Sequence, residues 1–513
     1  MRISSDYYMD LALPILNSID YKSGKARCCM EKYLEQVDYK GIFKYFAEIS
    51  KIPRGSGNEA GISEYLVSFA KSRGLIYNRD EANNVIIIKE ATPGYEDEPA
   101  IMLQGHMDMV CEKRKDSTHD FLKDGIKLLV DGDYLHADGT TLGADNGIAV
   151  AYMLALLSDD NLKHPRLECV ITADEEVGMN GAKALDVSSL KAKYMINLDS
   201  EEEGHILASC AGGLTGTSTL PVKRVRETGR KIKVSLGGLK GGHSGNDIAK
   251  NRTNANKLMA RLLFDLKQKE RYGLIHLEGG YKDNVIPREA FAELFINPGE
   301  FEQVKGSIDE LMQVYIKELE SSEPELHCTV EDLGEGSCDL IHPLSFEKLL
   351  FLLVQTPYGV QVMSSDMEGL VESSLNMGIL RTEEDKAVIC NSVRSSKSSY
   401  KHHISDRLKY LAEFLGGEYI VRSEYPAWEY RKESKLREHL NKHFKEMYGK
   451  EMKVEAIHAG LECGIISEKM PGMDIVSIGP DMSRVHTIDE ILSISSAIRV
   501  YQFLERILED RIR

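Results

Sequence analysis

The chain of 513 residues contains few cysteines and no regular spacing among them. Its nine cysteines include no C-x-x-C pair, and an odd number cannot pair completely. The sequence therefore indicates neither a disulfide framework nor a structural zinc knuckle. Unpaired thiols at irregular spacing are typical of a reducing compartment, so we expect a cytoplasmic protein.

Long hydrophobic stretches are also missing. The longest apolar runs, such as Ile148–Leu157 and Leu349–Val354, are much shorter than the about 20 residues that a membrane-spanning helix needs. The N-terminus lacks a basic segment followed by an apolar core, so we expect no signal peptide.

Positive charge is in deficit. Lys and Arg total 64 against 81 Asp and Glu, which gives a formal net charge of −17. Nucleic-acid binding and docking on anionic membranes both need a basic surface, so we expect neither partner. The sequence also contains no Walker motif and no strand-linked G-x-G-x-x-G, which excludes the common phosphate-binding loops.

Short apolar runs alternate with helical patterns in the first part of the chain. This alternation predicts an α/β domain with a mostly parallel central sheet. After Gly213 the pattern changes to that of an α+β domain. This change predicts a second domain, a lid domain, inserted into the first. We expect a lead-in over residues 1–38, the first domain over 39–212 and 398–513, and the inserted domain over 213–397.

Five segments place His, Asp or Glu directly after an apolar strand. The carboxyl ends of parallel strands meet at one crevice, so these side chains are expected to converge. Two imidazoles and several carboxylates without a thiolate suit zinc, cobalt or manganese. Each segment alone is an ordinary loop, and the fivefold repetition is what favours a metal site. The segments are LQGHMD with His106 and Asp108, LGADNG with Asp145, ITADEEVG with Glu175 and Glu176, INLDSEE with Asp199, and IGPDMSRVH with His486.

Several longer motifs carry a family resemblance over the chain from about Val37 to its end. They are IPRGSGNE, LQGHMDMVCEK, DGTTLGADNG, TADEEVGMNGA, NLDSEEEG, GGHSG, DNVIP, HAGLECG and IGPDMSRVHT. Together they resemble the zinc-dependent aminoacylase/carboxypeptidase/dipeptidase superfamily. More narrowly, they are similar to its aminoacyl-histidine (Xaa-His) dipeptidase branch.

The resemblance implies a catalytic domain that holds two zinc ions per subunit, with cobalt or manganese as substitutes. By the family pattern Asp145 bridges the two ions. His106 and Asp199 hold one ion, and Glu176 and His486 hold the other.

The same pattern implies roles for the neighbours of these ligands. Glu175 is the general base that takes a proton from the attacking water. Asp108 orients the imidazole of His106 and fixes its tautomer. The peptide bond between Asp145 and Asn146 is expected to be cis.

The inserted domain supplies the expected substrate contacts. His243 in GGHSG resembles the family histidine that hydrogen-bonds the scissile carbonyl oxygen, in its own subunit or in a partner's. Asn284 and Arg394 resemble the residues that hold the polar end of the substrate, and Arg suits a carboxylate because its planar fork binds both oxygens. In the second part of the first domain, over residues 398–513, Gly460 is expected to let the backbone approach the substrate closely.

These features imply a metal-dependent enzyme that hydrolyses the peptide bond of Xaa-His dipeptides, such as β-alanyl-histidine. One alternative keeps the chemistry and changes the substrate, giving a deacylase or a short-peptide carboxypeptidase. A more remote alternative is a non-catalytic binding protein on the same fold. The expected partners are a dipeptide and, as a candidate assembly, a second copy of the chain.

Overall fold

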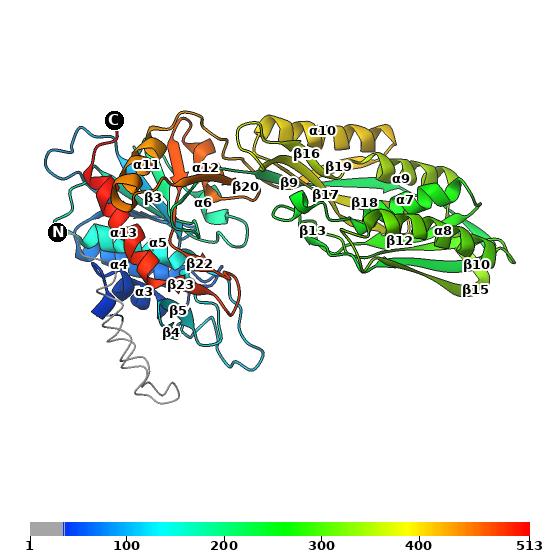
Figure 1. Ribbon diagram of the computed structural model, residues 1–513, viewed down its shortest axis with the longest axis horizontal. Helices are drawn as coiled ribbons and strands as arrows, with labels where there is room; N and C mark the ends of the chain where they lie inside the picture. The colour runs from blue at the N-terminus through cyan, green and yellow to red at the C-terminus, as the bar shows by residue number, and fades with distance from the viewer. Residues whose placement is uncertain (1–33, 35) are drawn as a thin grey trace. The chain divides into compact units, whose positions relative to one another are not determined.

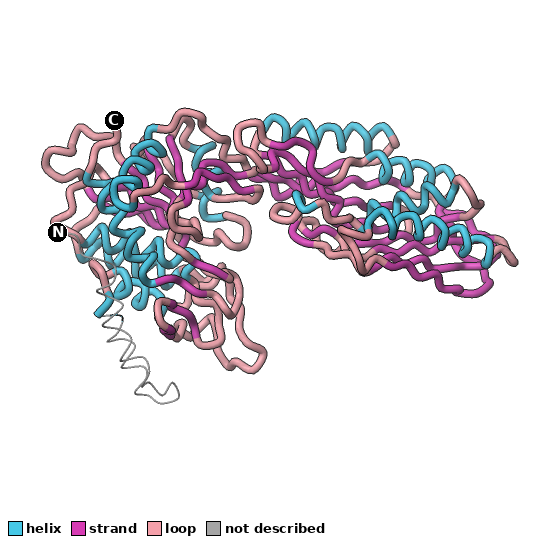
Figure 2. The backbone as a smooth tube through the Cα atoms, in the orientation of Figure 1, coloured by secondary structure: helices cyan, strands magenta, loops and turns pink. Residues whose placement is uncertain are grey.

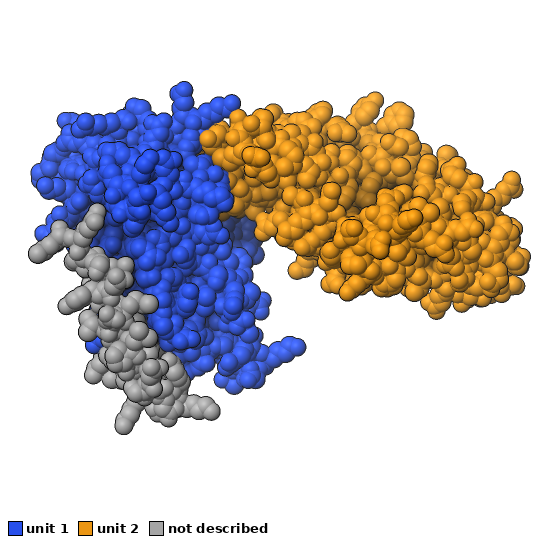
Figure 3. Space-filling model, viewed as in Figure 1, with its two compact units in different colours: residues 1–208, 431–455, 465–513 blue, residues 209–430, 456–464 orange. Residues whose placement is uncertain are grey.

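The computed structural model describes Leu34 and residues 36–513 (Figure 1). The described chain divides into two compact units, which Figure 3 shows in different colours. Unit 1 comprises the described residues up to Ala208 together with Arg431–Glu455 and Ile465–Arg513, and unit 2 comprises Ser209–Tyr430 and Ala456–Gly464. Most of the lead-in predicted over residues 1–38 lies outside the described residues.

Unit 1 is built on a mixed eight-stranded sheet (Figures 1 and 2). Its centre is parallel, because β3 pairs in parallel with β6 and β7, and β7 pairs in parallel with β21. The prediction of an α/β fold with a mostly parallel central sheet is confirmed. In spatial order the strands are β1 (Ile76–Arg79), β2 (Val85–Lys89), β6 (Leu167–Thr172), β3 (Ile101–His106), β7 (Tyr194–Asn197), β21 (Asp474–Ser477), β8 (His205–Cys210) and β20 (Lys453–Ile457).

Helix α5 (Ala144–Ser158) is the central helix of unit 1 and is buried along almost its whole length. It packs on β3, on α3 and on α13. Among the described residues, no helix combines the length and apolar character that crossing a membrane requires. The other helices near this sheet are α3 (Ile42–Ser50), α4 (Ala60–Ser72), α6 (Asn180–Ala184), α11 (Lys435–Tyr448), α12 (Glu462–Lys469) and α13 (Ile494–Glu509). A small sheet contains β22 (Met482–Ser483), β23 (Ile491–Ser493), β5 (Tyr134–Ala137) and β4 (Leu128–Asp131).

Unit 2 is built on an antiparallel nine-stranded sheet with helices packed on it (Figure 2). Alternating buried and partly exposed residues in β9 and β14 fit a sheet with one covered face. In spatial order the strands are β15 (His327–Ile341), β10 (Arg224–Gly237), β14 (Ala290–Ile296), β12 (Gly273–Gly279), β17 (Val371–Thr382), β18 (Lys386–Ser395), β9 (Gly212–Pro221) and β19 (Glu418–Tyr425), with β16 (Gly359–Met363) paired to β17. The remaining elements are α7 (Ala255–Lys267), α8 (Phe301–Leu319), α9 (Pro343–Gln355), α10 (Ser398–Phe414), the short 3-10 helix Ile248–Lys250, and the paired strands β11 (Gly242–His243) and β13 (Val285–Ile286).

The boundary expected at residue 397 differs from this division. Helix α10 packs on β9, β18 and β19, and β19 pairs with β9. Because both elements complete the antiparallel sheet, residues 398–430 belong to unit 2.

Gly105 allows β3 and α5 to approach closely. A Cβ atom at this position would lie 2.3 Å from Asn146 Oδ1 and 2.7 Å from the Cβ of Ala149. Asn146 Oδ1 accepts a hydrogen bond from the backbone N–H of His106 at 3.2 Å. The missing side chain therefore lets the start of α5 reach the end of β3.

We expect Gly105→Ala to destabilise the protein by about 1–3 kcal/mol, the usual cost of overpacking a close-packed interior. The methyl group would push Asn146 away from the backbone of His106. Chemical denaturation measures the effect. Gly306→Ala in α8 is the control, because its added methyl meets nothing within 4 Å and should stabilise the helix slightly. Equal stability of Gly105→Ala and the unsubstituted chain would contradict this account.

Candidate functional site

The five predicted strand-end segments converge in unit 1. His106 is the last residue of β3, and Asp145 lies in the first turn of α5. Glu176 and Asp199 follow β6 and β7, and His486 lies in the loop between β22 and β23. The structure brings all five predicted metal ligands together. His106, Glu176 and Asp199 meet because the parallel strands β3, β6 and β7 end at the same edge of the sheet, whereas Asp145 and His486 come from the start of α5 and from a loop of the small sheet.

Asp145 lies between the two imidazoles. Its Oδ1 is 3.1 Å from His106 Nε2, and its Oδ2 is 3.0 Å from His486 Nε2. Asp199 Oδ1 lies 3.5 Å from His106 Nε2, and Glu176 Oε2 lies 3.1 Å from His486 Nε2. The cluster therefore has two halves, each with one imidazole and one carboxylate of its own, and they share Asp145. The peptide bond between Asp145 and Asn146 is cis, as the resemblance implies.

Close packing of these carboxylates shifts their proton affinities. Burial, with the charges of Asp145 and Glu176, raises the pKa of Asp199 to about 6, although His106 opposes the shift. Burial would also raise the pKa of Asp145, but hydrogen bonds from both imidazoles lower it below its usual range. Hydrogen bonds to Asp145 and Glu176 raise the pKa of His486 to about 11. The cluster thus attracts positive charge strongly.

The residues present fit a pair of divalent cations. Glu176 Oε1 is buried and has no hydrogen-bond partner among the described residues. A buried carboxylate oxygen left without a partner is costly, and a metal ion would satisfy it. One aspartate with two oxygens, two imidazoles and two further carboxylates form a donor set that suits zinc.

Asp108 lies behind His106, as the sequence predicts. Its Oδ1 is 3.3 Å from His106 Nδ1 and accepts the backbone N–H of Glu175 at 3.0 Å. Its Oδ2 accepts the Ser56 hydroxyl and the backbone N–H of Glu176. Burial opposes ionisation of Asp108, but these hydrogen bonds, led by that of His106, lower its pKa to about 2. One carboxylate therefore contacts both the imidazole of His106 and the turn that carries Glu175.

Two buried residues that sequence reasoning missed hold the loop before Asp145. The carboxylate of Glu490 accepts the backbone N–H groups of Leu142, Gly143, Ala144 and Asp145 at 2.7–3.3 Å. The guanidinium of Arg54 donates to the carbonyl oxygens of Met107, Asp108 and Gly143. Arg54 is 1 % exposed and Glu490 is 2 % exposed. Both lie in or beside quoted motifs, IPRGSGNE and IGPDMSRVHT, which is the signal that could have identified them.

The predicted substrate residues all lie in unit 2. His243 ends β11, and its Nδ1 accepts the backbone N–H groups of Gly245 and Asn246 at 3.3 and 3.2 Å. Burial, followed by the charge of Arg394, lowers the pKa of His243. A neutral ring with Nδ1 used as an acceptor carries its proton on Nε2, so His243 presents one N–H donor.

Arg394 is a buried cation on β18, opposite Ser374 of β17. Its Nη1 donates to the Tyr425 hydroxyl at 2.8 Å, and its Nε has no hydrogen-bond partner among the described residues. Ser374 Oγ lies 2.7 Å from Nε2 of the buried His458. Sequence reasoning singled out Arg394 and missed these polar neighbours, because the strand pairing brings them together.

Asn284 and Gly460 lie at loop positions of unit 2. Asn284 is exposed, directly precedes β13, and accepts the backbone N–H of Ser244 through its carbonyl oxygen. Gly460 lies two residues before α12. Their roles in substrate binding stay predictions.

Comparisons with known proteins agree with the family resemblance of the sequence motifs. The model of peptidase family M20/M25/M40 matches residues 102–510. A cytosol non-specific dipeptidase of Escherichia coli (strain K12) is 37% identical over 479 residues, covering 93% of this chain and 99% of the relative. The solved structure of an aminoacylhistidine dipeptidase from Vibrio alginolyticus is 34% identical with a TM-score of 0.86, covering 92% of this chain and 98% of that chain. An aminopeptidase structure from Bacillus cereus, at 16% identity and a TM-score of 0.52, covers 92% of this chain and 99% of its own and shares the fold.

We expect Glu490→Gln to weaken zinc binding at Asp145 by about 10–100-fold, the usual effect of losing support for a metal ligand. The new amide would turn N–H donors toward backbone N–H groups that need an acceptor. Zinc titration of the metal-free protein measures the change. Glu505→Gln, on α13 and hydrogen-bonded to Tyr39, is the control. Unchanged zinc affinity in Glu490→Gln would mean that this carboxylate does not position Asp145.

Proposed function

The chain belongs to peptidase family M20/M25/M40, and on this basis we propose that it is a metal-dependent dipeptidase with a preference for Xaa-His dipeptides. The observation that carries the proposal is the two-halved cluster around Asp145, whose oxygens face His106 and His486. The names of the Escherichia coli and Vibrio alginolyticus relatives support a dipeptide as the substrate.

We assign one zinc ion to His106, Asp145 and Asp199 and a second to Glu176, Asp145 and His486. When bound, two such cations polarise a carbonyl oxygen and make a water molecule more acidic. Asp108 keeps the imidazole of His106 in place for this role, through its contact with Nδ1.

Glu175 is the proposed general base. Its backbone is fixed by the N–H donated to Asp108 Oδ1. The carboxylate of Glu175 takes a proton from the attacking water as the new C–O bond forms. It then passes that proton to the amine nitrogen as the C–N bond breaks, so the residue ends the cycle ionised.

The residues of unit 2 are assigned to the polar end of the substrate and to its carbonyl group. His243 donates its Nε2–H to the carbonyl oxygen, where negative charge develops in the transition state. Arg394 binds the terminal carboxylate of the dipeptide, and its Nε, which has no hydrogen-bond partner within the described part of the chain, supports this role. Asn284 and the backbone at Gly460 supply further polar contacts.

A second candidate function is a broad dipeptidase without preference for histidine at the second position. The name of the Escherichia coli relative, a non-specific dipeptidase, favours it. A panel of dipeptides assayed with the zinc-loaded enzyme separates the two candidates. A deacylase or short-peptide carboxypeptidase would instead show its highest kcat/KM on acylated amino acids or longer peptides.

We further propose that the enzyme works in the cytosol, in line with the name of the same relative. Assembly into a homodimer stays a prediction. In such a dimer His243 would act either in its own subunit or in the partner's.

We expect Glu175→Gln to keep both zinc ions and to lose about 10²–10⁴-fold in kcat, the range for removing a general base. Elemental analysis and a dipeptide assay check the two halves of this prediction. Glu202→Gln, an exposed carboxylate paired with His205, is the control and should stay fully active. Loss of one zinc equivalent in Glu175→Gln would mean that Glu175 is a ligand and that the roles of Glu175 and Glu176 are reversed.

We expect Arg394→Met to lower kcat/KM for dipeptides by a factor that corresponds to several kcal/mol of lost transition-state stabilisation, since each charge-assisted hydrogen bond contributes about 1.5–3 kcal/mol. The substituted enzyme should also lose its preference for a dipeptide over the C-terminal amide of the same compound. Arg381→Met is the control, because Arg381 is exposed and paired with Glu383. If Arg394→Met keeps the preference for the free acid, Arg394 does not bind the carboxylate.

A further inference from the structure

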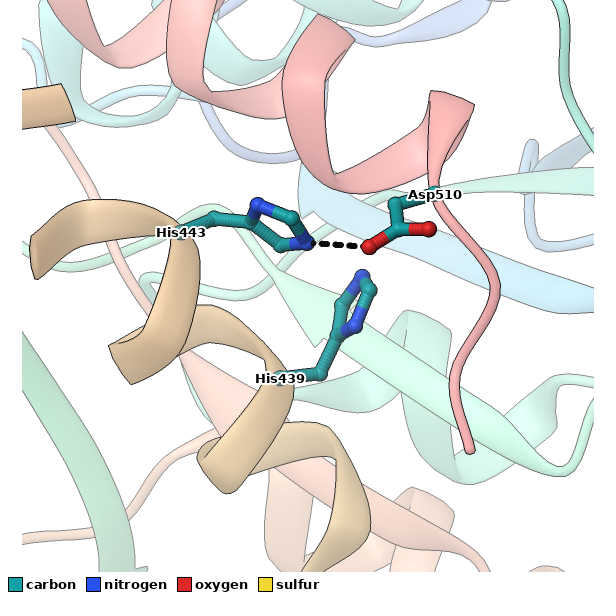
Figure 4. Close-up of side chains that lie close together, drawn as sticks. All are labelled: His439, His443 and Asp510. Atoms are coloured by element: carbon teal, nitrogen blue, oxygen red, sulfur yellow. Dashed lines mark ion pairs between the residues drawn. The ribbon is translucent and has the colours of Figure 1, made fainter. Parts of the chain in front are cut away.

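A second group of potential metal ligands lies in unit 1, where α11 meets the end of α13 (Figure 4). His439 and His443 are four residues apart on α11, so they lie on the same face of the helix. Asp510 is the residue that directly follows α13. One ligand atom from each of the three lies within 4.8 Å of the others.

The two imidazoles are buried, and the group reaches solvent mainly on the side of the Asp510 carboxylate. His443 is 0 % exposed and His439 is 7 % exposed, whereas the Asp510 side chain is 32% exposed. The rings meet edge to face with centroids 4.6 Å apart, and Figure 4 shows both pointing toward Asp510. An ion could reach this position without opening the core.

His443 uses one ring nitrogen in a hydrogen bond and holds the other at ion-pair distance from Asp510. Nδ1 lies 3.1 Å from Glu446 Oε2, and Nε2 lies 2.9 Å from Asp510 Oδ2. Nevertheless, Nε2 makes no hydrogen bond among the described residues. A neutral imidazole carries one N–H, and placing it on Nδ1 toward a carboxylate is how proteins orient a ligating histidine. Nε2 then turns its lone pair toward Asp510 Oδ2. Two lone pairs that face each other repel, and a cation bound by both atoms would remove this repulsion.

The end of α13 adds further negative potential. His439 Nε2 lies 3.0 Å from the carbonyl oxygen of Ile507, in the last turn of the helix. The backbone N–H of Arg511, which would bind this oxygen in a longer helix, donates to Asp510 Oδ1. Carbonyl groups at a helix C-terminus favour a positive charge.

We propose that His439, His443 and Asp510 bind a divalent transition-metal ion, with zinc the best suited, at a site separate from the cluster around Asp145. Two imidazole nitrogens and a carboxylate oxygen are zinc ligands, and the Ile507 carbonyl oxygen lies beside them. The 2.9 Å between His443 Nε2 and Asp510 Oδ2 is slightly shorter than the spacing of about 3.3 Å between ligands of a tetrahedral zinc ion. His439 Nε2 donates its N–H to the Ile507 carbonyl oxygen, so binding of the ion through Nε2 would require the proton of this ring to be on Nδ1 instead. The ion would connect α11 to the C-terminal end of α13.

Lys442 competes for this site. Its Nζ lies 3.0 Å from Asp510 Oδ2, the same oxygen that faces His443. The Lys442 side chain is 56% exposed, so it can leave without a large loss of packing. Removing it should therefore strengthen zinc binding, whereas an ordinary ion-pair cluster would gain no metal from the same change.

Zinc content after equilibrium dialysis tests the proposal, with the full chain and zinc alone as the probe. We expect the unsubstituted protein to hold about one more equivalent than His443→Gln and Asp510→Asn. Lys442→Gln should half-saturate this equivalent at about 10-fold lower free zinc. His402→Gln, whose imidazole pairs with Glu424 in unit 2, is the control and should keep the full content. Dipeptide hydrolysis is measured in parallel and should not change, so failure at this site is distinguished from failure at the catalytic cluster.

Equal zinc content in the unsubstituted protein, His443→Gln and Asp510→Asn would overturn the proposal and leave His443 as a member of an ordinary ion-pair cluster with Glu446 and Asp510. His443 is fully buried, so its substitution is checked by circular dichroism. If His443→Gln does not fold, Asp510→Asn decides, because Asp510 is partly exposed and its amide keeps the same shape.

Discussion

Repulsion among Asp145, Glu176 and Asp199 is the constraint on which the rest of the site depends. Their carboxylates lie together in a buried position, where like charges disfavour ionisation. Burial, followed by the charges of Asp145 and Glu176, raises the pKa of Asp199 to about 6, even beside His106. Two imidazoles offset part of this charge, and the unpaired oxygen of Glu176 marks where more positive charge is needed. A binding site for cations follows from this imbalance, and the proposed hydrolytic chemistry uses it.

The fold keeps the repelling groups in place through rigid neighbours. His106 comes at the end of a fully buried parallel strand, and Asp145 begins a buried helix. Gly105 lets these two elements touch. Glu490 and Arg54 then fix the loop before Asp145 by hydrogen bonds to its backbone N–H and carbonyl groups. A flexible surface loop without such buried partners would not hold Asp145 in one position. Because side chains on rigid elements lose little freedom when a ligand binds, the cluster is organised in advance for metal ions.

Local sequence was sufficient for the elements that carry the cluster. β3, β6, β7 and β21 are short apolar runs, and α5 is an apolar run of helical length. The same reasoning placed residues 398–430 in the wrong unit, because a helical period does not say which sheet α10 will cover. Strand β19 pairs with β9 across about 200 residues of sequence, and no local pattern reveals such pairing.

Long-range contacts also explain the functional residues that were missed. Arg54 binds carbonyl groups that are 53–89 residues away along the chain. Glu490 reaches the N–H groups of a loop about 350 residues earlier. The pair His439 and His443 is visible at helical spacing, but Asp510 joins it only when α11 and α13 pack together.

Anomalous diffraction at the zinc edge, from crystals of the zinc-loaded protein, tests the central claim most directly. At the cluster around Asp145 the account predicts two peaks about 3.5–4 Å apart, one beside His106 and Asp199 and the other beside Glu176 and His486, with Asp145 between them; the separate site proposed at His443 and Asp510 would give a further peak away from this cluster. A single peak at this cluster, or peaks that Asp145 does not contact, would contradict it.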